Sequence, residues 1–85
     1  MFSYLRQVAI CESVRQMIKR ALAQSDDVDI RPKANNISST DNILRAVRLS
    51  LRVDNEERLK DFIIENVLRS LHLTAIQREH LILSS

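Results

Sequence analysis

The lack of chain-breaking residues constrains the fold of this chain more than any other feature of its sequence. There is no glycine, and the only proline is Pro32. Tight sheet hairpins and phosphate-binding loops both depend on glycine, so neither is expected here. The apolar residues are mainly Leu, Ile, Val and Ala, a composition typical of packed helices. The sequence therefore predicts an all-α protein and disfavours a nucleotide-binding enzyme.

The length and composition predict one small folded domain over residues 1–85. Apolar residues make up 45% of the chain and charged residues 28%, which is typical of a globular protein rather than a disordered one. A single core of this size is marginal without help, and the one cysteine, Cys11, cannot form an intramolecular disulfide. We therefore expect a homodimer.

The same features bear on where the protein works. A lone cysteine fits a reduced, cytoplasmic setting, and Cys11 is expected to be a small buried thiol without a catalytic role. No apolar run approaches the ~20 residues that span a bilayer, so no membrane partner is expected. The net charge of +2 is too small to indicate nucleic acid as a partner by itself.

Apolar residues recur at three-and-four spacing in four stretches, which indicates amphipathic helices. The expected helices cover residues 3–24, 40–53, 55–71 and 75–83, and together they predict a small helical bundle. In the first helix, the stripe expected to face the core is Ile10, Val14, Met17, Ile18 and Ala21.

Capping signals precede the three later helices. A side-chain oxygen at the cap accepts a hydrogen bond from a backbone N–H of the first turn, and a Glu or Gln three residues later can return the bond. The candidate caps are Ser39 or Thr40, then Asp54 with Glu57, then Thr74 with Gln77. These caps support the predicted helix boundaries.

A long polar stretch, SDDVDIRPKANNISST, separates the first two helices as a loop over residues 25–40. Loops of this length are uncommon in compact domains, so this one is expected either to be mobile or to carry a short extended piece at Val28 and Ile30. Its aspartates lack the glycine and the terminal glutamate of a calcium-binding loop, and no metal site is predicted.

Three arginines, Arg45, Arg48 and Arg52, lie on one narrow face of the second predicted helix. They are the candidate contact residues for a protein partner or for nucleic acid. Three interpretations stay open. The face is merely solvated, or it contacts DNA phosphates with salt-dependent affinity, or it holds the acidic surface of a protein through forked hydrogen bonds.

Two features count against nucleic acid. Glu57, Asp61 and Glu65 form an acidic ridge on the next predicted helix, and a helical hairpin would bring this ridge near the arginines. Aromatic side chains that could stack on single-stranded bases are few. Of the two binding interpretations, a regulatory protein partner is therefore preferred over nucleic acid.

The third predicted helix is apolar over more than half of its circumference, which is more than one packed helix can cover. The excess apolar surface is expected to lie at a two-fold interface between identical chains. The residues predicted to form this dimer interface are Phe62, Ile63, Ile64, Val67 and Leu71.

No pattern of catalytic residues stands out. His72 and His80 lie eight residues apart, with no cysteine or further histidine at ligand spacing, so zinc is not predicted. No nucleophile, base and orienting group can be grouped from the sequence. We expect no enzymatic activity, no cofactor and no small-molecule substrate.

The stretches NILRAVRLSL and DFIIENVLR, joined by a polar hinge, resemble the C-terminal helical hairpin of the YmgB/AriR family of small regulators. The resembling positions are Asn42, Ile43, Ser50, Leu51, Asp61, Ile63, Glu65, Val67, Leu68 and Arg69. The resemblance implies a small all-helical homodimer that acts as a connector or regulator in biofilm formation, stress response or transcription. It also implies an association with DNA.

The sequence therefore predicts a small non-enzymatic regulatory protein that works through protein–protein interaction. One alternative is a DNA-associated transcriptional regulator that uses the face of Arg45, Arg48 and Arg52. Another is a structural subunit or chaperone-like component of a larger assembly.

Overall fold

The computed structural model describes residues 3–50 and 55–84, and the side chains of residues 3–48 and 55–81. Within these ranges all regular structure is helical, which confirms the predicted all-α class. The elements are α1 (Tyr4–Ala23), the 3-10 helix η1 (Arg31–Asn36), α2 (Thr40–Ser50), α3 (Glu56–Ser70) and α4 (Ala75–Ser84).

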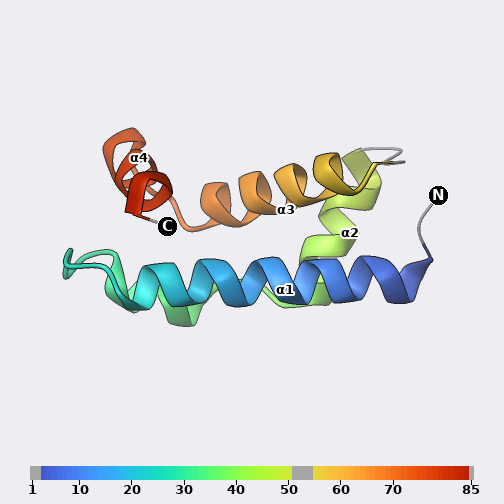
Figure 1. Cartoon of the computed structure of the whole chain (residues 1–85), viewed down its shortest axis with the longest axis horizontal. Coiled ribbons are helices and arrows are strands. Elements are labelled where there is room, and N and C mark those ends of the chain that lie inside the picture. Colours follow the sequence, from blue (N-terminus) through green and yellow to red (C-terminus); the bar gives the residue numbers. More distant parts are fainter. Residues whose placement is uncertain (1–2, 51–54, 85) are drawn as a thin grey trace.

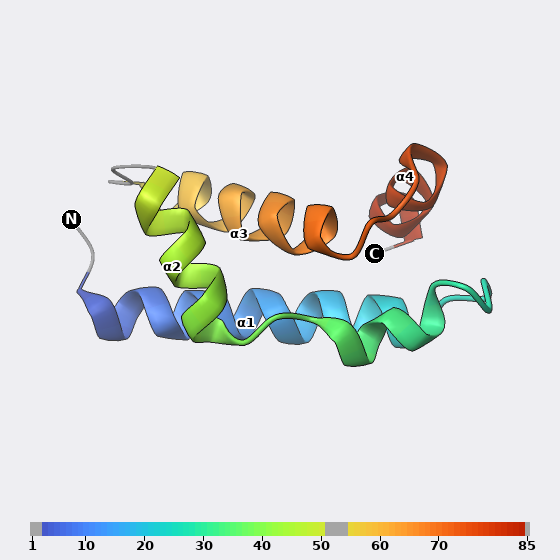
Figure 2. The same ribbon diagram turned by 180° about the vertical axis from the view of Figure 1, so that it is seen from behind.

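The helices form an elongated bundle whose extents are 39 × 20 × 19 Å. Figures 1 and 2 show α1 and α3 side by side, running in the same direction along the long axis. Near one end of the molecule α2 crosses steeply from α1 to α3, and α4 stands at the other end, above the last turns of α1 (Figure 1). The molecule therefore has one end built from the start of α1 and α2, and another built from the end of α1 and α4.

One hydrophobic core draws on α1, η1, α2 and α3. The largest side chains buried almost completely in it are Leu22, Ile43, Leu44, Ile63, Val67 and Cys11. Each such aliphatic side chain contributes roughly 1.5–3 kcal/mol relative to full exposure. The buried side of α1 differs from the predicted stripe: Met17 is 52% exposed and Ala21 is only half-buried, whereas Leu22 is completely buried. Met17 instead lines a cavity between α1 and α4.

The polar stretch between α1 and α2 contains the 3-10 helix η1, which the sequence did not predict. Val28 and Ile30 lie in a turn, so the alternative of a short extended piece at these two residues is wrong. The main-chain oxygen of Asp27 accepts the N–H of Ile30 at 3.1 Å, and Pro32 stands in the first turn of η1, where its fixed φ suits a helix start. Ile30 and Ala34 are buried, so the segment packs on the core through these two side chains.

Two of the predicted caps are confirmed. The Oγ of Ser39 accepts the N–H of Asn42 at 3.2 Å and begins α2. Thr74 and Gln77 form the reciprocal capping box of α4, because each side chain accepts the other residue's backbone N–H, at 3.0 and 3.1 Å. The sequence therefore placed the starts of α2 and α4 correctly.

The cap of α3 is Asn55, one residue after the predicted position. Its side-chain oxygen accepts the N–H groups of Glu57 and Arg58 at 2.8 and 3.3 Å. Asp54, the predicted cap, lies outside the described residues. Asn and Asp are both good caps, so the three-residue spacing to a glutamate was not enough to choose between the adjacent residues Asp54 and Asn55.

The end of α3 turns the chain away from the bundle at His72. This residue has a φ of 55°, in the left-handed region where glycine is preferred after a helix. Its N–H donates to the Arg69 carbonyl at 3.1 Å. The turn directs α4 across the bundle, where Arg78 binds Glu65 of α3 at 2.6 Å.

Candidate functional site

Two of the three predicted contact arginines lie on the outer face of α2. Arg45 and Arg48 are exposed, whereas the apolar side of the same helix, including Ile43 and Val47, is buried. Arg52 lies outside the described residues. The predicted amphipathic arrangement of α2 is therefore confirmed for the part that the structure describes.

The side chain of Arg48 is held by α1. Its guanidinium carbon lies 4.6 Å from the centre of the Tyr4 ring, which is within cation–π range. The Tyr4 hydroxyl in turn donates a hydrogen bond to Asp41 Oδ1 at 3.3 Å. Sequence reasoning missed Tyr4 and Asp41, because only the packing of α2 across α1 brings together residues 37 positions apart.

These side chains surround a cavity of about 410 Å³, which we call the arginine cavity. It is lined by Tyr4, Asp41, Leu44, Arg45 and Arg48. Arg45 has no ion-pair or hydrogen-bond partner among the described residues. The cavity thus combines two cationic side chains, a half-exposed aromatic ring and a buried leucine beside one carboxylate. A small anionic group with an apolar neighbour fits this set of side chains.

The acidic ridge of α3 pairs with other basic residues. Glu57 Oε1 lies 3.9 Å from Lys60 Nζ, and Glu65 binds Arg69 at 3.5 Å as well as Arg78 of α4. No ion pair within the described ranges joins the ridge to the arginines of α2. α2 and α3 cross at a steep angle instead of lying side by side as a helical hairpin (Figure 2). Arg45 and Arg48 therefore stay exposed.

The residues predicted for a dimer interface divide into two groups. Ile63, Val67 and Leu71 are buried inside the single chain, with exposed fractions of 0%, 0% and 5%. Phe62 and Ile64 are partly buried at the edge of the core. Only these last two side chains keep apolar surface that a second copy could cover.

The remaining candidates for chemistry are a buried thiol and two exposed histidines. Cys11 is completely buried, as predicted, and burial raises the pKa of its thiol above the ordinary value, although a hydrogen bond with Thr40 opposes the shift. His72 and His80 lie on the surface. Over residues 3–50 and 55–84, no three His, Cys, Asp or Glu side chains gather where they could hold a metal ion.

None of the described helices combines the length and the hydrophobicity that crossing a membrane requires. The longest, α1, spans 20 residues but carries charged side chains along its exposed side.

A second, larger cavity lies between α4 and the end of α1, and we call it the α1–α4 cavity. Its volume is about 930 Å³. Apolar side chains of both helices line it, including Met17, Ile76 and Leu81, and Asp26 and Asp27 line it from the loop that follows α1. The sequence did not indicate this site, because the spacing of Met17 is that of a core residue.

The structure thus presents two candidate binding surfaces at opposite ends of the molecule, one at the crossing of α1 and α2 and one beneath α4 (Figure 1). Comparison of the chain with protein-family models, with curated proteins and with solved structures finds no match.

Proposed function

We propose that this chain is a small non-enzymatic regulatory protein that binds an acidic segment of a partner protein in the arginine cavity. The observation that carries the proposal is the exposed pair Arg45 and Arg48, one of them positioned by Tyr4. Arginine presents a planar fork of donors that matches a carboxylate. Positioning one guanidinium before binding lowers the entropy lost when a partner docks.

The composition of the cavity indicates which kind of acidic segment fits. Leu44 is 2% exposed and forms an apolar base, and half of the Tyr4 surface is free. A carboxylate that is followed by an apolar side chain would meet the arginines and these apolar groups together. A short segment that alternates Asp or Glu with Leu, Ile or Phe is therefore the preferred ligand.

Asp41 favours a protein over nucleic acid. Its carboxylate lines the same cavity as the arginines and accepts the hydrogen bond of Tyr4. A fixed negative charge at that point repels the phosphates of DNA. Because these phosphates are closely spaced, they cannot all be kept away from the Asp41 carboxylate. A flexible peptide can place its carboxylates next to the arginines and its apolar residues next to Asp41.

The resemblance to the YmgB/AriR family extends the proposal to the biological setting. It supports a regulator of biofilm formation or stress response that acts as a homodimer. In that setting the acidic segment belongs to a signalling or transcription protein that the dimer binds.

Binding of a labelled acidic-apolar peptide, followed by fluorescence anisotropy, tests the proposal. Arg45→Ala and Arg48→Ala should each weaken binding about tenfold, since each removes a hydrogen bond to a charged group. Arg58→Ala is the matched control, because Arg58 is also exposed and also lies over an aromatic ring, that of Phe62 at 6.0 Å. It should leave the affinity unchanged.

A duplex DNA of mixed sequence, titrated at several salt concentrations, forms the second arm of the experiment. If the duplex binds more tightly than the peptide, weakens steeply with salt and loses its affinity in the same arginine variants, the chain is a DNA-associated regulator instead. If neither ligand responds to the two arginine variants, the arginine face is only solvated surface and the proposal is wrong.

A further inference from the structure

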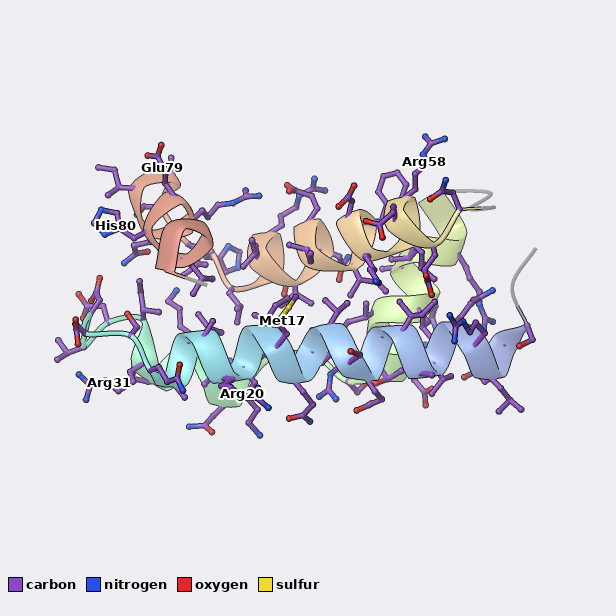
Figure 3. All side chains as sticks on the ribbon, in the orientation of Figure 1. Met17, Arg20, Arg31, Arg58, Glu79 and His80 are labelled. Carbon is purple, nitrogen blue, oxygen red and sulfur yellow. The ribbon has the colours of Figure 1, made fainter. Side chains whose placement is uncertain are left out.

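The α1–α4 cavity exposes apolar surface that the fold itself leaves uncovered. Met17 on α1 is 52% exposed and Ile76 on α4 is 69% exposed, and both line this cavity of about 930 Å³. Figure 3 shows Met17 on the side of α1 that faces α3. Leu81, which is partly buried, and Ile30, which is 3% exposed, also line the cavity. Concave apolar surface of this size is typical of binding grooves.

The loop end of the cavity is acidic. Asp26 and Asp27 line it there, and no ion pair among the described residues includes either of them. One oxygen of Asp27 accepts the Asp29 N–H at 2.8 Å, and this bond fixes the carboxylate in the turn. Among the described residues, the charged side chains that line the cavity are these two aspartates and Arg20; with the lining His80 counted as neutral, the formal balance is negative.

We propose that the α1–α4 cavity binds an amphipathic helix of a second protein, with a Lys or Arg at the end that meets Asp26 and Asp27. Its apolar residues, spaced three and four apart, would cover Met17 and Ile76. Recognition of this kind places the apolar face of one helix in a groove between helices of another protein. The basic residue sets the direction of the bound helix because only one end of the cavity carries the aspartates.

The charge balance favours this ligand over a second copy of the same chain. A two-fold contact places the same surface of both copies in one interface. Each copy would then contribute two aspartates against a single arginine, so two negatively charged surfaces would face one another. A helix with a basic end neutralises the aspartates instead, and its apolar face covers the same side chains.

The site is independent of the arginine cavity. The two lie at opposite ends of α1 and share no lining residue. Loss of binding in the α1–α4 cavity can therefore be measured while binding in the arginine cavity is kept. A negative result for one cavity does not refute the proposal for the other.

Two model peptides of about four helical turns test the inference by titration of the full-length, ¹⁵N-labelled chain. Both carry leucines on one face, and they differ only in ending with lysines or with glutamates. The lysine peptide should shift the amide resonances of Met17, Gln24 and Ile76 and bind about threefold to tenfold more tightly than the glutamate peptide. Asp26→Asn with Asp27→Asn should abolish that difference.

Ile76→Gln should weaken the lysine peptide at least tenfold, because the leucines lose an apolar contact with a residue that lines the cavity. Leu5→Gln is the matched control. Leu5 is 79% exposed on α1 and does not line the cavity, so this variant should bind like the parent chain. Both substitutions replace exposed helix residues with a good helix former, and circular dichroism should show an unchanged fold.

Three results would overturn the inference. The first is equal affinity for the two peptides, which would mean that the aspartates do not select a basic end. The second is an equal loss of binding in Ile76→Gln and Leu5→Gln, which would mean non-specific adhesion. The third is self-association of the free chain that Ile76→Gln abolishes in sedimentation equilibrium, which would assign the cavity to a second copy.

Discussion

Ile63 provides the most direct test of how the apolar surface of α3 is covered. The sequence pattern assigned this residue to an interface between two chains, whereas the structure buries it completely within one chain. Truncation to alanine removes three carbon atoms, which is worth roughly 2.4 kcal/mol of apolar transfer free energy. The cavity left behind raises the expected loss of unfolding free energy to about 3 kcal/mol.

That loss is large for a chain of this length. Domains of this size have unfolding free energies of roughly 4–13 kcal/mol. A loss of about 3 kcal/mol corresponds to a fall in melting temperature of roughly 12–24 °C. Thermal and urea unfolding of Ile63→Ala, followed by far-ultraviolet circular dichroism, measures the loss of unfolding free energy and the fall in melting temperature.

The control for Ile63→Ala is the neighbouring substitution Ile64→Ala. Ile64 is only partly buried at the edge of the core, so its truncation should cost roughly 1 kcal/mol. Because the contacts of Ile63 are intramolecular, its effect should be the same at low and high protein concentration. A loss below about 1 kcal/mol for Ile63→Ala, or an effect that depends on concentration, would refute the assignment of Ile63 to the core of a single chain.

Three further predictions follow from single features of the fold. Asn55→Ala removes the cap of α3 and should lower the unfolding free energy by about 1 kcal/mol in urea titration; no change would mean that another group caps the helix. His72→Gly relieves a left-handed backbone conformation and should raise the melting temperature, by the equivalent of about 0.5–1 kcal/mol; a decrease would contradict that reasoning. Burial raises the pKa of the Cys11 thiol, so the unfolded chain releases this proton at lower pH than the folded chain. Stability should therefore fall as the pH rises through the alkaline range, more steeply than in Cys11→Ala, when urea unfolding is measured at each pH.

The helices themselves could be predicted from local sequence. A helix boundary depends on residues within a few positions of it, such as the cap at Ser39 and the capping box of Thr74 and Gln77, and these were placed correctly. Where two neighbouring residues were both good caps, as at the start of α3, local rules could not choose between them. The 3-10 helix was missed because six residues with one proline carry no periodic apolar pattern.

The candidate sites could be predicted only in part. The outward position of Arg45 and Arg48 follows from the spacing of one helix, and the sequence indicated it. Their neighbour Tyr4 comes from another helix, and nothing near it in the sequence marks it as part of a site. The α1–α4 cavity left no sequence signal at all, since Met17 and Ile76 have the spacing and hydrophobicity of ordinary core residues.

The sequence by itself determined the all-helical class, most helix ends and the polar face of α2, because spacing, caps and the absence of glycine act over a few residues. Only the tertiary structure decided which apolar surfaces are covered. Ile63 and Met17 both lie in predicted apolar stripes, yet one is buried completely and the other is half exposed. The physical reason is that burial depends on which helices pack together, and here α1 and α3 cover one another while α4 leaves a cavity beside α1.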